Sequence, residues 1–110
     1  MGNDRRSPVS KLIDLGTHLG QTAVVLLVEL QPETSDRIHV HLRAYPANGN
    51  LHLPTGVQLV LADAAGQAVS TVTAREADNY IQLRLIGQPG EAFGVTLALN
   101  QISVTEQFLI

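Results

Sequence analysis

The stretch RIHVHLRAY, residues 37–45, decides the fold of this chain. Its apolar and polar residues alternate without a break, which is the period of a β-strand that has one buried face and one solvent-facing face. The face expected to be buried carries Ile38, Val40, Leu42 and Ala44. The opposite face carries Arg37, His39, His41, Arg43 and Tyr45. This stretch therefore predicts a half-buried strand, and other strands of the same kind should show the same two-residue period.

The two-residue period recurs between turn residues along the rest of the 110-residue chain. We expect further strands at 11–15, 22–30, 57–61, 68–74, 80–85, 93–99 and 102–110. Glycine and proline separate them, as in Gly87-Gln88-Pro89-Gly90, and no helical period persists for three turns. About 7–8 short strands at this spacing predict an all-β antiparallel sandwich of immunoglobulin-like type. We expect one such domain over residues 10–110, after a flexible N-terminal segment over residues 1–9.

Two of the expected strands depart from simple alternation. In the strand 22–30, Val25 and Leu27 give the second face apolar side chains where a one-sided strand should carry polar ones. We therefore expect something to cover them: an adjacent segment, a missing domain or a second copy of the chain. We also expect Gln31-Pro32 to end this strand, and a β-bulge near Thr105-Glu106 to reset the phase of the last one.

The composition excludes several classes of protein. The chain has no cysteine, which removes disulfide frameworks, thiolate metal sites and cysteine nucleophiles. Its 7 basic and 10 acidic residues give a net charge of −3, so we expect no affinity for nucleic acid. The longest apolar run, residues 23–28, is far shorter than a membrane helix, and no export signal is evident at the N-terminus. We expect a cytoplasmic protein that makes no contact with a membrane.

The polar face of 37–45 supplies the candidate binding surface. In an immunoglobulin-like order this strand neighbours the strand 80–85, and together they would present a basic surface edged by aromatic rings. Its members are Arg37, His39, His41, Arg43, Tyr45, Tyr80 and Arg84. Arginine and tyrosine are enriched at interaction hot spots, which favours a protein partner over nucleic acid and leaves an ordinary solvated face as the alternative. A second candidate interface, for a partner or for self-association, is the apolar set Val25, Leu27 and Val60.

His39 and His41 are also the best metal-like pair, because side chains two residues apart on a strand project side by side. Two ligands do not complete a site, and His52 would lie about 13 Å from His41 even if Asn48-Gly49 closed a hairpin. The serines lack a Gly-x-Ser-x-Gly elbow, and the spacing of the carboxylates places no close pair in a cleft. We therefore expect no catalytic residues, no metal and no cofactor, in a protein that is not an enzyme.

Four stretches resemble a known family: IDLG (13–16), ADNYIQL (77–83), GQPGEAF (87–93) and VTEQFLI (104–110). They are similar to the C-terminal part of an uncharacterised cyanobacterial family, known only as a domain of unknown function. The resemblance implies longer members in which a mainly helical region precedes this module. Such a helical region could pack against the second apolar face of the strand 22–30, which carries Val25 and Leu27. No catalytic or binding residues follow from the resemblance.

Function hypotheses of different classes remain. The first is a non-enzymatic protein-interaction or adaptor module, acting through a protein partner or through self-association. The second is a small ligand- or metal-binding module that uses the strand face of His39 and His41. The third is a purely structural domain of a larger protein.

Overall fold

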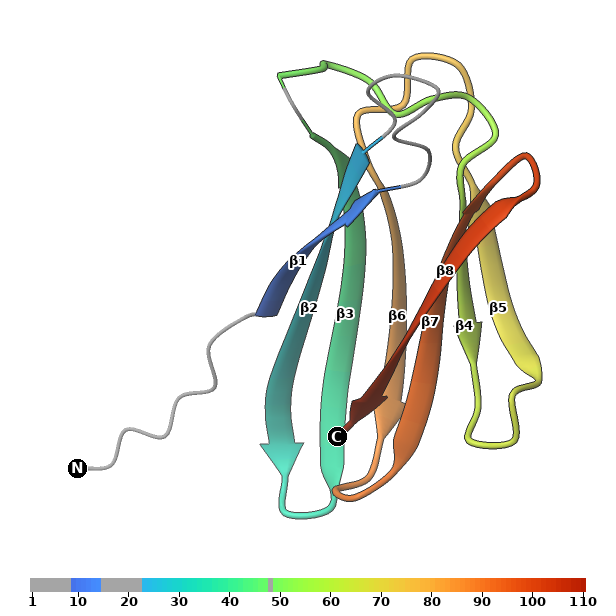
Figure 1. The fold of residues 1–110 in the computed structure, drawn as a ribbon. Helices are drawn as coiled ribbons and strands as arrows, with labels where there is room; N and C mark the ends of the chain where they lie inside the picture. The colour runs from blue at the N-terminus through green and yellow to red at the C-terminus, as the bar shows by residue number, and fades with distance from the viewer. Residues whose placement is uncertain (1–8, 15–22, 48) are drawn as a thin grey trace.

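The computed structural model describes residues 9–14, 23–47 and 49–110, which form an all-β protein (Figure 1). Apart from Val9, the N-terminal segment expected to be flexible, residues 1–9, lies outside the described residues. The described strands are β1 (Val9–Asp14), β2 (Ala23–Thr34), β3 (Arg37–Pro46), β4 (Gln58–Ala62), β5 (Ala68–Thr73), β6 (Ile81–Gly87), β7 (Ala92–Leu99) and β8 (Ile102–Leu109). All of their pairings are antiparallel, so the predicted all-β antiparallel class is confirmed.

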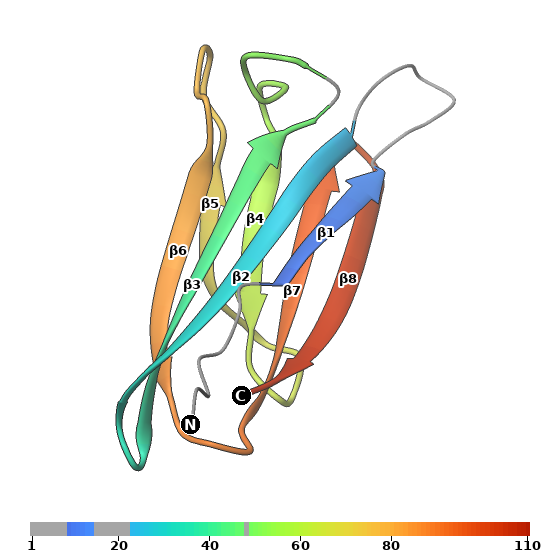
Figure 2. The same ribbon diagram turned by 90° about the vertical axis from the view of Figure 1, so that its left-hand side faces the viewer.

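The strands form two sheets of four strands each. Sheet A has the order β1-β2-β3-β6, and sheet B has the order β5-β4-β7-β8. Figure 2 shows the two sheets as layers, with β6 and β5 along one side of the molecule and β1 and β8 along the other. The chain crosses between the sheets three times: from β3 to β4, from β5 to β6, and from β6 to β7.

The core lies between the two sheets. The inward residues of β3 are those that the alternation predicted, and Leu42 and Ala44 are fully buried. Leu26 of β2 packs in the same cluster as Leu59 and Leu97 of sheet B, and each of these leucines is at most 1% exposed. Burial of one such side chain stabilises the fold by about 1.5–3 kcal/mol. The sandwich is therefore held by aliphatic packing between its layers.

The expected end of the second strand at Pro32 is wrong, because β2 continues to Thr34. Among the described residues, β1 pairs with β2 as far as Val28, and Pro32 has a ladder partner only in β3. A proline without its N–H is tolerated at such an edge position. The ladder between β2 and β3 shifts register between Pro32 and Thr34.

The bulge expected near Thr105-Glu106 is also wrong, since β8 pairs with β7 without a register shift. Glu106 lies opposite the buried Val95 and is half-buried on the inward side of β8. A charge that points inward from an edge strand is a known protection against pairing with another edge. The phase of the last strand therefore needs no correction.

The connection from β5 to β6 contains a strained alanine. Ala77 has a φ of 67°, in the left-handed region that costs an L-residue about 1–2 kcal/mol. We expect Ala77→Gly to raise the free energy of unfolding by about 0.5–1 kcal/mol, because glycine adopts this φ without a Cβ clash. Urea denaturation measures the change. Ala65→Gly, at an exposed turn residue without a positive φ, should lower stability slightly, and a loss in both variants would contradict the strain.

Candidate interaction surface

The structure brings the residues predicted to bind together on the outer face of sheet A. The strand β3 pairs with β6 as expected, with His41 opposite Arg84 and Arg43 opposite Gln82. The rings of Tyr45 and Tyr80 lie 5.6 Å apart between centroids, at an interplanar angle of 32°. The face is made by the polar residues of β3 together with Tyr80 and the outward residues of β6.

An acidic residue of β2 neutralises the middle of this face. Glu29 lies opposite His41 in the ladder and accepts a hydrogen bond from Nη2 of Arg43. This bond raises the pKa of Arg43, more than partial burial lowers it. Nη1 of Arg43 donates to the hydroxyl of Tyr45 at 3.1 Å, while its buried Nε has no partner among the described residues. Arg43 is thus fixed between an acid and an aromatic ring.

A second acid of β2 neutralises the far end of the same face. Oε1 of Glu33 lies 2.8 Å from Nε2 of His39 and 4.0 Å from Nε of Arg37. Of the arginines on this face, Arg84 has no ion-pair partner within the described part of the chain. The expectation of a basic surface is therefore wrong: the outer face of sheet A is nearly charge-balanced, with one arginine left over.

The apolar residues of the second face of β2 lie on this same outer face. Val25 is opposite Tyr45 and Leu27 is opposite Arg43, and both valine and leucine are half-buried. Sheet B packs on the inner face of sheet A, and none of the described strands packs on its outer face (Figure 2). Val60 lies on the outer face of sheet B, so it does not join Val25 and Leu27 in one interface.

The outer face of sheet B is different in chemistry. Thr71 and Thr96 flank Val60 in register, and Thr105 follows Thr96, so a row of hydroxyls crosses the sheet. The hydroxyls of Thr96 and Thr105 are hydrogen-bonded at 2.7 Å. The described strand residues that face outward here carry no charge. Of the two outer sheet faces, only that of sheet A carries arginine, tyrosine and ion pairs among the described strand residues.

Among the described residues, the His39 and His41 pair gathers no third metal ligand. Nε2 of His41 lies 2.7 Å from Oε1 of Gln82, so this ring is already engaged by a neighbour on β6. His52 is exposed in the connection to β4, which belongs to the other sheet, and β3 pairs with β2 and β6 rather than with the segment that contains His52. Asn48 itself lies outside the described residues. Within the described ranges, no group of three or more His, Cys, Asp or Glu could hold a metal ion.

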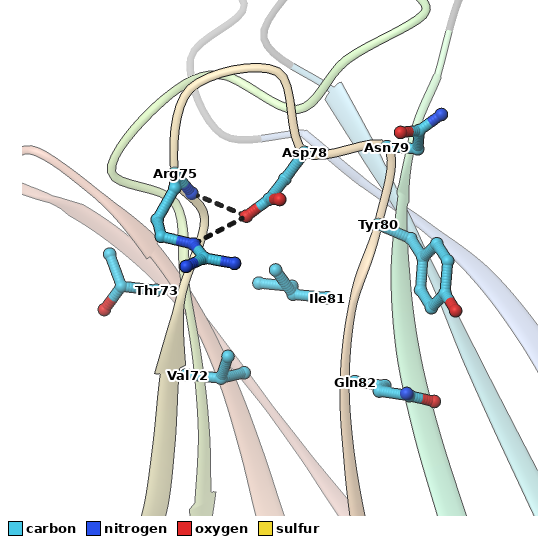
Figure 3. A pocket seen from close by; sticks show the side chains of 8 residues that line it. All are labelled: Val72, Thr73, Arg75, Asp78, Asn79, Tyr80, Ile81 and Gln82. Atoms are coloured by element: carbon cyan, nitrogen blue, oxygen red, sulfur yellow. Dashed lines mark hydrogen bonds and ion pairs between the residues drawn. The ribbon is translucent and has the colours of Figure 1, made fainter.

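Two cavities open between the edge strands β5 and β6. The polar cavity, of about 420 Å³, lies beside the connection from β5 to β6, and Figure 3 shows Arg75 and Asp78 at its rim and Ile81 turned toward it. The carboxylate of Asp78 accepts a hydrogen bond from the backbone N–H of Arg75 at 2.7 Å, which holds the turn. The apolar cavity, of about 230 Å³, is lined by Leu61, Val69, Leu85, Ile86, Phe93 and Ile110, among others.

The fold and the surface define the class of this protein as a two-layer β-sandwich with one charge-balanced, aromatic outer face. A family model described as "Protein of unknown function (DUF1822)" matches residues 3–109, and the chain belongs to this family. The resemblance to an uncharacterised domain is thereby confirmed. No match was found among curated proteins or among solved structures. No helix in the described ranges is long and apolar enough to cross a membrane.

Proposed function

We propose that this chain is a non-enzymatic protein-interaction module that binds a protein partner through the outer face of sheet A. The observation that carries the proposal is the pair of tyrosine rings, 5.6 Å apart, beside the half-buried Val25. Tyr80 is 45% exposed although it is a large aromatic residue. Tyrosine and arginine, which lie together in this area, are among the residue types enriched at interaction hot spots.

The register of the sheet makes this area continuous. Val25 of β2 is opposite Tyr45 of β3, which contacts Tyr80 beside β6, and Leu27 extends the apolar strip to Arg43. The ion pairs of Glu33 lie toward the other end of the same face. The area thus combines aromatic and aliphatic side chains with one arginine, Arg43, whose charge is paired with Glu29. Aromatic residues and arginine are enriched at protein interfaces.

A pair of variants on opposite sheets tests the proposal. Leu27→Glu places a charge in the apolar strip, and we expect it to reduce capture of the partner from a lysate of the source organism about tenfold or more. Val60→Glu is the matched control, because Val60 is also half-buried but lies on the outer face of sheet B. It should leave capture unchanged. Thermal denaturation verifies that both variants are folded, and equal capture by the two would contradict the proposed face.

We further propose that the sandwich is immunoglobulin-like. If β2 to β8 are taken in order as seven strands, the pairs β3-β6 and β4-β7 correspond to the B-E and C-F pairs of that fold. The fourth strand, β5, lies beside β4 rather than beside β6, which departs from the constant-type order. The strand β1 then adds one more strand beyond β2.

We also propose a context for the module from the resemblance of its turn and strand sequences. The family would be cyanobacterial, and this module would be the C-terminal part of its longer members, preceded by a helical region. Such a region is the first candidate to cover Val25 and Leu27 in those members. The two leading partners, a helical region of the same protein and a separate protein, would thus use the same face.

A further inference from the structure

We propose that the free edge of β6 is a second docking site, which takes an extended peptide segment carrying an acidic residue as a fifth strand of sheet A. Among the described residues β6 pairs only with β3, over all seven positions from Ile81 to Gly87. In an antiparallel pair every second residue directs its N–H and C=O away from the partner strand. An extended segment can satisfy these groups by adding to the edge.

The other three sheet edges carry features that oppose strand addition. Glu106 lies on the inward side of β8. The strand β5 has an irregular register, since Leu61 pairs with Ser70 but Ala62 with Ala68, which leaves Val69 as an extra residue. The strand β1 contains Lys11. Lysine, bulges and inward charges are among the devices that protect edges.

The edge of β6 lacks the lysine, the bulge and the inward charge that the other three edges carry. Its sequence, IQLRLIG, contains no lysine and no proline, and its ladder with β3 shows no register shift. Its inward residues Leu83 and Leu85 are half-buried and apolar, and Ile86 is 50% exposed. Of the four edges, β6 is therefore the one suited to accept another strand.

Two cavities lie where the inward side chains of an added strand would point. The polar cavity is lined by Ile81 near the start of β6, and the apolar cavity by Leu85 near its end. These two residues are four positions apart, which is about 13 Å along a strand, so a segment of about five residues spans both cavities. Pockets for alternate side chains give specificity to strand addition, and the apolar cavity would select an aliphatic or aromatic residue.

The charge of the edge selects the occupant. Arg84 lies at the centre of β6, is exposed, and has no ion-pair partner in the described part of the chain. An acidic residue opposite it in the new strand would be stabilising, whereas like charges opposite one another are destabilising. In full antiparallel overlap of β6 with its own copy, the two Arg84 residues, at the centre of the strand, would lie opposite each other. The edge therefore disfavours a second copy and favours a segment that alternates apolar residues with an acid.

A peptide titration tests this site. The probe is a blocked nonapeptide, TVTLEVTVT, and its counterpart has lysine in place of glutamate. We expect the glutamate peptide to bind the intact chain below about 1 mM, to shift the backbone NMR signals of residues 80–87, and to slow amide exchange at alternate residues of β6. We expect the lysine peptide to bind about fivefold more weakly.

Charge reversal at position 84 tests whether Arg84 causes the preference for the glutamate peptide. In Arg84→Glu the preference should invert, with the lysine peptide binding about fivefold more tightly than the glutamate peptide. Arg37→Glu, at another exposed arginine of sheet A, should keep the original preference. Leu27→Glu should bind the peptide as the unaltered chain does, so failure of the outer-face proposal would not affect this result. Absence of binding at 1 mM, signal shifts confined to another edge, or an unchanged preference in Arg84→Glu would overturn the proposal.

Discussion

Replacement of Leu42 by alanine is expected to lower the free energy of unfolding by about 2–5 kcal/mol. Leu42 is 0% exposed and lies on β3, a central strand of sheet A, between Val28 and Leu83 in the ladder. Ladders on both sides fix the backbone there, so the layers cannot close over the lost side chain. A domain of this size has a total stability of only about 5–15 kcal/mol, and the variant should lose a large share of it.

Urea denaturation followed by far-UV circular dichroism measures this loss. Leu109→Ala is the matched control, because Leu109 is 68% exposed on the edge strand β8. Its stability should change by no more than about 0.5 kcal/mol. Equal losses in the two variants would mean that Leu42 does not lie in the core.

A second large effect is expected at Leu26, where Leu26→Asp should leave the chain unfolded at room temperature. Leu26 is 1% exposed between the sheets, and an unpaired carboxylate there loses its hydration without gaining a partner. The neighbouring substitution Leu27→Asp should be tolerated. Leu27 is half-buried on the outer face and lies opposite Arg43, which would attract the new carboxylate.

This pair of variants tests the phase of β2 directly, because a slip of one residue exchanges the two faces of a strand. Dispersion of backbone NMR signals distinguishes the folded chain from the unfolded one. A folded Leu26→Asp together with an unfolded Leu27→Asp would mean that the faces are inverted. Dispersed signals from both variants would mean that neither residue is buried.

The fold class could be predicted because each strand is buried on one side only. In β3 the buried and exposed faces require apolar and polar residues to alternate along the sequence. The residues predicted to face inward are all buried: Ile38, Val40, Leu42 and Ala44. The pairing of β3 with β6 could also be expected, since it follows from the strand order of common sandwiches. The first prediction depends on periodicity, which a single sequence carries, and the second depends on the strand order that sandwiches share.

The electrostatics of the candidate surface could not be predicted in the same way. The outward phase of β2 runs on from Leu27 through Glu29 to Glu33, past the proline that was expected to end the strand. Which basic residues these acids meet depends on the register of the hairpin between β2 and β3. The register places Glu29 opposite His41 and within reach of Arg43, and so turns a basic surface into a balanced one.

Sheet membership is likewise absent from the periodicity. Val60 shares its outward, half-exposed character with Val25, yet β4 and β2 belong to opposite sheets. Glu106 alternates in step with the inward residues of β8, and a bulge was expected there because an inward charge is costly in a central strand. At an edge strand, which borders solvent, the same residue is acceptable. Both outcomes depend on the position of the strand within its sheet.

The path of the chain between the layers also governs how the molecule forms. His41 pairs with Arg84, 43 residues later in the sequence, and β4 and β5, which lie between β3 and β6 in the chain, belong to sheet B. Neither layer is therefore a separate folding unit, and the domain should melt in one cooperative transition. Because these pairings close long loops, its folding belongs to the slow, millisecond-to-second class of β-proteins.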